Sequence, residues 1–96
     1  MIVIRDVFQA QYGKGGDLVN LLKQAQNQWP DLYAYRILTD MSGTFFSVVT
    51  ETEAESLGEW ERRIAEVFSQ PDFGKWFAKM TPLVSSGRRE FYNVEA

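Results

Sequence analysis

The pattern of apolar and polar positions divides the chain into strand-like and helix-like segments, beginning with a strand and a helix. Residues 2–11 (IVIRDVFQAQ) are rich in β-branched and aromatic types and contain neither glycine nor proline, which is typical of a β-strand. Beyond the glycines that follow, apolar residues recur at the spacing of one helical face from Leu18 to Trp29. This spacing predicts a helix over residues 14–28, which ends before Pro30 because proline disfavours helix at the preceding residue.

A β-hairpin and a second helix are predicted in the middle of the chain. Residues 33–39 (YAYRILT) and 44–50 (TFFSVVT) flank the polar, glycine-containing spacer 40–43. Two pairs, Thr52 with Glu55 and Ser56 with Glu59, match the capping box, so we expect a helix to start there. Its buried stripe is expected to comprise Leu57, Trp60, Ile64, Val67 and Phe68, and its solvated face Glu55, Glu59, Arg62, Arg63 and Glu66.

The last third of the chain predicts a short helix and a final strand. Apolar residues of the segment 73–80 recur at helical spacing, and Pro82 with the turn 85–87 is expected to end this helix. Residues 88–95 (RREFYNVE) then form the last strand. The element order β-α-β-β-α-β is that of a ferredoxin-like α+β fold, with a four-stranded antiparallel sheet, helices on one face and a short extra helix before the last strand. We expect residues 1–96 to form one such domain.

The strands carry apolar residues on both parities, and this predicts a homodimer. The first strand has Ile2, Ile4 and Phe8 on one parity and Val3 and Val7 on the other, and the third has Phe45 and Val49 against Phe46 and Val48. An antiparallel sheet with one wet face alternates apolar and polar residues instead. Since no further helix is available to cover the second face, we expect a second copy to pack there, sheet against sheet.

Composition and charge exclude several classes of function. Of 96 residues 13 are acidic and 10 basic, and the net charge of −3 disfavours nucleic acid and anionic membranes as partners. There is no cysteine and no histidine, so thiolate chemistry, histidine bases and the commonest metal and haem ligands are excluded. We therefore expect no metal or cofactor. The sequence contains no 18-residue apolar run and no signal-peptide pattern, so we expect a cytoplasmic protein.

Three local patterns have simpler structural interpretations than functional ones. The segment 13–16 (GKGG) lacks the spacing of a phosphate-binding loop and is typical of a flexible turn. The glutamates of residues 51–61 suit the positive end of a helix dipole. RNA-recognition domains share the element order, but residues 42–48 lack the basic residue and alternating aromatic residues of the RNA-binding strand.

Several segments together resemble the dimeric α/β-barrel superfamily, which includes antibiotic-biosynthesis monooxygenase-like and NIPSNAP-like domains. The resemblance rests on Tyr12-Gly13-Lys14, the strand end Arg36 to Asp40 with Gly43, the acidic segment 51–61, Phe73 with Trp76, and the final segment 87–92. In that group two ferredoxin-like chains close their sheets into a shared barrel. Members range from cofactor-free oxygenases to haem-degrading enzymes and proteins without assigned activity, so the resemblance implies an architecture and leaves the activity open. A histidine-ligated haem role is contradicted by the absence of histidine.

The candidate ligand-binding residues are Arg5, Tyr35, Arg36, Trp60, Trp76 and Tyr92. Their aromatic rings are expected to line a cavity between helices and sheet, where an arginine would stabilise an anionic oxygen. No residue is assigned a catalytic role. Two functions follow: a dimer that binds a small apolar or aromatic ligand without catalysis, and a cofactor-free monooxygenase acting on an aromatic or quinone-like metabolite. The strand parity stays open, because a shift of one residue exchanges Arg5 for Asp6 and Tyr35 for Arg36 in the cavity.

Overall fold

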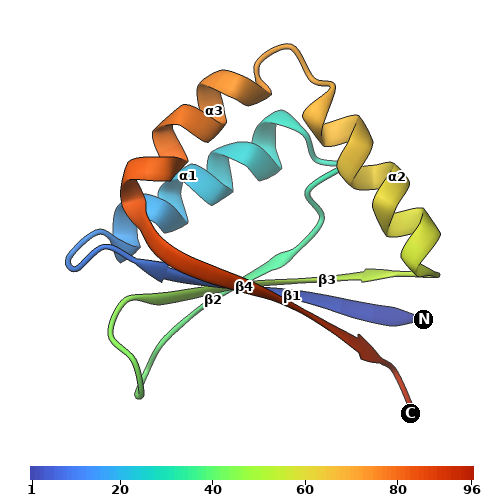
Figure 1. The fold of residues 1–96 in the computed structure, drawn as a ribbon, viewed down its shortest axis with the longest axis horizontal. Coiled ribbons are helices and arrows are strands. Elements are labelled where there is room, and N and C mark those ends of the chain that lie inside the picture. The colour runs from blue at the N-terminus through green and yellow to red at the C-terminus, as the bar shows by residue number, and fades with distance from the viewer.

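The computed structural model describes residues 1–96 and contains the expected order of elements. These are β1 (Ile2–Ala10), α1 (Gly15–Gln28), β2 (Arg36–Thr39), β3 (Ser47–Ala54), α2 (Leu57–Phe68), α3 (Phe73–Met80), the 3₁₀ turn η1 (Thr81–Leu83) and β4 (Val84–Asn93). The strands form one antiparallel sheet in the order β2-β3-β1-β4. Figure 1 shows all three helices on the same face of this sheet, and the other face carries no helix. The ferredoxin-like α+β fold is therefore confirmed.

Three strands begin at other residues than predicted. β2 begins at Arg36 rather than at residue 33. β3 begins at Ser47 rather than at residue 44 and continues to Ala54. The reason is Phe46, whose φ of 57° lies in the left-handed region, so the chain cannot enter the sheet before it. β4 begins at Val84, so the residues 85–87 that predicted a turn lie within this strand. There the hydroxyl of Ser85 donates to the carbonyl of Gln9 at 3.0 Å, which ties the start of β4 to the end of β1.

The core lies between α1 and the sheet and is closed by α3. The predicted stripe of α1 is confirmed, because Leu18, Leu21, Leu22, Ala25 and Trp29 are all buried. Trp76 of α3 is also buried, and its indole N–H donates to the carbonyl of Leu21 at 2.9 Å. The side chain is thus part of the core.

The predicted stripe of α2 is only partly buried. Val67 is 1% exposed, whereas Leu57 and Phe68 at the two ends of the helix are 50% and 62% exposed. The helix leaves the sheet as it rises from β3 toward α3 (Figure 1), and a helix that diverges from the sheet buries only part of its apolar face. The space below α2 is therefore occupied by long side chains, which form the site described next.

Candidate functional site

The period of two along each strand decides which side chains face the helices. In β1 the even-numbered side chains face the helices, since Ile4 and Ala10 are each 2% exposed. In β3 the buried Val48, which lies opposite Phe8, belongs to the same face. Directly opposed residues of antiparallel strands share a face, so Asp6 lies on the helix-facing side together with Arg89 of β4. A carboxylate and a guanidinium therefore lie, partly exposed, on the face of the sheet that packs against the helices.

Asp6 and Arg89 form a two-pronged ion pair beneath α2. The Nε and Nη2 atoms of Arg89 donate to the two carboxylate oxygens of Asp6 at 2.6 and 3.1 Å. The guanidinium lies over the ring of Trp60, 4.8 Å from its centroid, in a cation–π arrangement. Phe91 packs edge-on against the same ring at 5.1 Å and is 46% exposed. The ion pair is thus bordered by an aromatic wall that solvent reaches.

Two tyrosines from the segment before β2 lie within electrostatic reach of Asp6, and Tyr33 packs its ring against Trp29 and Trp76. Burial, followed by the carboxylate of Asp6, raises the pKa of Tyr33 to about 12, while Arg89 acts in the opposite direction. The pKa of Tyr35 is raised by burial and by Tyr33 and Asp6. The Tyr35 hydroxyl donates to the carbonyl of Leu22 at 3.0 Å, whereas the Tyr33 hydroxyl has no hydrogen-bond partner in the protein. At neutral pH Tyr33 is therefore a protonated donor near a charged pair. We call Asp6, Tyr33, Trp60, Arg89 and Phe91 the helix-side cluster.

The six candidate residues do not converge on one cavity. Trp60 belongs to the helix-side cluster and Tyr35 packs against Tyr33 at 5.3 Å. Trp76 lies in the core. Arg5, Arg36 and Tyr92 lie on the opposite face of the sheet, so their expected position between helices and sheet is wrong. The physical reason is strand parity, which puts Asp6 rather than Arg5, and Phe91 rather than Tyr92, beside the helices.

Sequence reasoning missed four members of the helix-side cluster, namely Asp6, Tyr33, Arg89 and Phe91. The signal that could have found them is the even parity of β1, which combines Ile2, Ile4, Phe8 and Ala10 with a single charge at Asp6. One carboxylate among otherwise apolar residues on the same face of a strand calls for a cationic partner, and β4 contains two adjacent arginines. Only the register of β1 against β4 identifies Arg89 as that partner.

The opposite face of the sheet, called the outer face below, carries a row of alternating charges. In the strand register Arg36 of β2 lies opposite Glu51 of β3, Glu51 opposite Arg5 of β1, and Arg5 opposite Glu90 of β4, whose ion pair is with Arg88 at 2.9 Å. Arg36 Nη2 and Arg5 Nε donate to the Glu51 carboxylate at 2.5 and 2.8 Å, and these bonds from Arg36 and Arg5 hold its pKa below the usual range. The guanidinium of Arg5 also lies 5.7 Å from the ring of Tyr92.

The apolar residues of the outer face are Val3, Val7, Leu38, Val49 and Tyr92, between which the charged row runs. The expectation that both faces are apolar is therefore only partly correct. It counted Phe45 and Phe46 as strand residues, but both lie in the loop before β3. The outer face is a mixed surface, with charged and apolar rows side by side.

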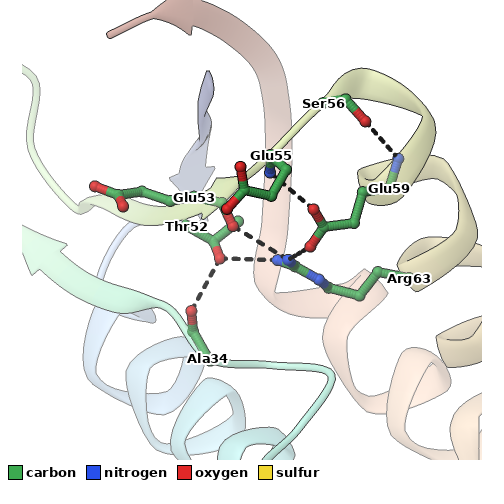
Figure 2. Close-up of polar contacts among 7 residues, drawn as sticks. All are labelled: Ala34, Thr52, Glu53, Glu55, Ser56, Glu59 and Arg63. Atoms are coloured by element: carbon green, nitrogen blue, oxygen red, sulfur yellow. Dashed lines mark hydrogen bonds and ion pairs between the residues drawn. The ribbon is translucent and has the colours of Figure 1, made fainter. Parts of the chain in front are cut away.

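An open groove of about 640 Å³ lies at the edge of the sheet, where β3 extends beyond β2. Its lining includes Tyr35, Arg36, Thr52 and Arg63. Figure 2 shows that Arg63 reaches from α2 to β3. It donates to Thr52 Oγ1 at 3.2 Å and to the carbonyl of Glu53 and the carboxylate of Glu59, both at 3.1 Å. The expected solvated position of Arg63 is therefore wrong, and its guanidinium binds the end of β3 that pairs with β1 but extends beyond β2.

The capping of α2 confirms one of the two predicted pairs (Figure 2). Ser56 is the N-cap, and its hydroxyl accepts a hydrogen bond from the Glu59 amide at 3.2 Å. The Glu59 carboxylate accepts from the Glu55 amide at 2.8 Å, one residue before the cap. The alternative pair is wrong, because Thr52 lies within β3 and its hydroxyl donates to the carbonyl of Ala34 at 2.9 Å.

The chain has no cluster of three or more acidic, histidine or cysteine side chains that could hold a metal ion. None of its helices combines the length and the apolar character needed to cross a membrane. The polar groups that the fold brings together are thus arginines, single carboxylates and tyrosine hydroxyls. Groups of these types are able to hydrogen-bond an oxygen atom.

The fold is shared with known protein structures, although no protein-family model and no curated protein matches the sequence. A NIPSNAP domain protein from Burkholderia xenovorans is 17% identical with a TM-score of 0.83, over 100% of this chain and 96% of that chain. A NIPSNAP family protein from Agrobacterium tumefaciens is 16% identical with a TM-score of 0.85, over 96% and 90% of the two chains. A proposed antibiotic biosynthesis monooxygenase from Deinococcus radiodurans is 14% identical with a TM-score of 0.70, over 100% and 94%.

These neighbours define the class of protein to which the structure is similar, the ferredoxin-like NIPSNAP and monooxygenase-like proteins. At identities below 20% the likeness shows the fold and nothing of the activity. The function must therefore be argued from the side chains of this chain.

Proposed function

We propose that this protein is a homodimer that binds a small aromatic ligand carrying an oxygen substituent, at the helix-side cluster of each subunit. The observation that carries the proposal is the Asp6–Arg89 pair on the helix-facing side of the sheet, next to the unpaired hydroxyl of Tyr33. The side chains of Asp6 and Arg89 are 23% and 43% exposed, so solvent reaches the pair and its polar groups stay available on the face of the sheet that packs against the helices. The position of the pair beside an accessible aromatic wall suits a ligand with one apolar and one polar end.

The position of each group indicates how such a ligand would lie. Trp60 and Phe91 offer ring faces and edges for an aromatic body, and aromatic pairs contribute about 0.5–1.5 kcal/mol beyond the area they bury. Arg89 provides N–H groups for a hydroxyl or oxyanion, and Tyr33 provides a further donor because its raised pKa keeps it protonated. Oxygenation is the second candidate function. Asp6 favours this function, because its carboxylate could accept a proton from the substrate. The adjacent guanidinium of Arg89 could then stabilise the resulting substrate anion.

The homodimer is supported by the uncovered outer face. Tyr92 is 49% exposed and Leu38 37% exposed there; Leu38 lies in a row with Val49 of β3 and Val7 of β1, and Tyr92 lies opposite Val3 of β1. An apolar surface on a sheet face that no helix of the same chain covers is typical of an interface. Light scattering on the purified protein tests this part: a mass near twice the chain mass of 11.1 kDa is expected, and a monomer at micromolar concentration would overturn it.

Ligand binding is tested by titration with 1-naphthol, which has an aromatic body and one hydroxyl. Saturable quenching of tryptophan fluorescence is expected, because Trp60 contacts the proposed site. Arg89→Met should weaken binding at least about tenfold, as expected for a charge-assisted hydrogen bond worth 1.5–3 kcal/mol. The matched control is Arg88→Met, which removes the neighbouring arginine from the outer face and should leave the affinity unchanged. Equal affinities for the two variants, or no saturation, would refute the site.

Oxygenation is tested on the same samples with an oxygen electrode and a hydroxylated aromatic compound that has an oxidisable CH₂ group. Conversion of CH₂ to C=O consumes one O₂ and releases one water. Oxygen uptake that depends on both Asp6 and Arg89 would favour the enzyme, and binding without uptake favours the non-catalytic ligand-binding protein.

A further inference from the structure

The charged row of the outer face consists of four residues in neighbouring strands at one level of the sheet. Across the sheet in the order β2-β3-β1-β4, these residues are Arg36, Glu51, Arg5 and Glu90. The signs alternate without interruption, and the row spans three strand spacings, roughly 14 Å. All four side chains retain some solvent exposure, from 11% for Glu51 to 75% for Arg36.

When a row of four alternating charges faces a second copy of itself in reversed order, every positive charge lies opposite a negative one. If a second copy faces the first after rotation about an axis parallel to the strands, the order of its strands is reversed. Arg36 of one copy then lies opposite Glu90 of the other, and Glu51 lies opposite Arg5 of the other. If the axis instead runs across the strands, each residue lies opposite its own copy, and four like-charge pairs result. Like charges brought together at an interface cost several kcal/mol.

The adjacent apolar row agrees with the first arrangement. It contains Leu38, Val49 and Val7 in the same strand order, followed by Arg88, whose guanidinium is paired with Glu90 at 2.9 Å. Reversal places Val49 of one copy opposite Val7 of the other at the centre, where β3 and β1 of both copies meet. Leu38 then faces the aliphatic stem of Arg88, which is a favourable contact for a long basic side chain.

We infer that the row Arg36–Glu51–Arg5–Glu90 selects a dimer whose two-fold axis runs parallel to the strands, with β2 of one copy over β4 of the other. This inference rests on the proposed homodimer and adds its orientation. The row selects between the two orientations of the dimer by destabilising the one in which like charges face each other, and it adds little to the affinity of the favoured one.

The experiment measures the dimer dissociation constant by analytical ultracentrifugation for the wild type, Arg36→Glu and Glu90→Arg. Each single variant creates two like-charge contacts per dimer between positions 36 and 90, so its dissociation constant should rise at least about tenfold. An equimolar mixture of the two variants should form heterodimers with affinity close to that of the wild type, because every contact is then between opposite charges. Lys23→Glu on α1 reverses a charge away from the sheet and should leave dimerisation unchanged.

The outcomes separate the two proposals. A monomeric wild type overturns the homodimer itself. If the wild type is a dimer and both single variants dimerise with unchanged affinity, only the orientation is overturned. In the other orientation each residue faces its own copy, so reversing its charge replaces one like-charge pair by another. Far-ultraviolet circular dichroism shows whether each variant is folded. The milder variants Arg36→Gln and Glu90→Gln serve if a reversal prevents folding, and smaller but parallel losses of affinity are then expected.

Discussion

The substitution Arg89→Met is the sharpest perturbation of the helix-side cluster, because it leaves the carboxylate of Asp6 without its partner. The pair is intermediate between a surface and a buried ion pair, since the side chains of Asp6 and Arg89 are 23% and 43% exposed. Surface pairs contribute about 0–1 kcal/mol, and breaking a buried pair costs about 3–5 kcal/mol. For this half-buried pair we expect a loss of about 1.5 kcal/mol, to which the cation–π contact with Trp60 adds about 0.5 kcal/mol.

Urea unfolding at fixed protein concentration measures this loss. A change of about 2 kcal/mol with a denaturant slope of about 1–2 kcal/mol per molar lowers the unfolding midpoint by about 1–2 M. In a thermal scan the same change lowers the Tm by about 10 °C. Arg88→Met is the matched control, because Arg88 is 66% exposed on the other face and its loss breaks only a surface ion pair with Glu90, worth about 0–1 kcal/mol, so the midpoint should fall clearly less.

A double-mutant cycle with Asp6→Asn isolates the interaction between the two side chains. We expect a coupling free energy of about 1 kcal/mol, since contacting residues in one ion pair are not additive. Equal effects of Arg89→Met and Arg88→Met, or a coupling below about 0.3 kcal/mol, would show that the pair is a solvated surface contact. The helix-side cluster would then lose its central feature.

Three further predictions concern other parts of the molecule. Burial raises the pKa of Tyr33 from 10.0 to about 12, so the contribution of Tyr33 to stability is fully present below pH 10 and is lost as the pH rises from about 10 to about 12. Tyr33→Phe should reduce this loss in urea titrations. Trp76→Ala should cost about 3–5 kcal/mol and abolish cooperative thermal unfolding, because it empties a buried site and removes the bond to Leu21. Ser56→Ala removes the acceptor of the Glu59 amide and should lower the unfolding free energy by about 1 kcal/mol, and an unchanged Tm would contradict the role of Ser56 as a cap.

The sequence by itself determined the order of elements, the ferredoxin-like α+β class and the buried stripe of α1. These depend on local periodicity, which a chain shows without reference to its partners. The helical spacing from Leu18 to Trp29 corresponds to five buried residues in the structure. The boundaries of β3 and β4 were less accurate, since the left-handed conformation of Phe46 and the pairing of residues 85–87 with β1 arise from tertiary contacts.

Only the tertiary structure decided which side chains form the helix-side cluster. Neighbouring residues of a strand point to opposite faces, so an error of one position exchanges Arg5 for Asp6 and Tyr92 for Phe91. The apolar residues of β1 occur on both parities and cannot make that choice locally. The choice comes from the packing of α1 on Ile4, Ala10 and Val48, and from the register that places Asp6 opposite Arg89. For the same reason the charged row of the outer face exists only after four separate strands are aligned.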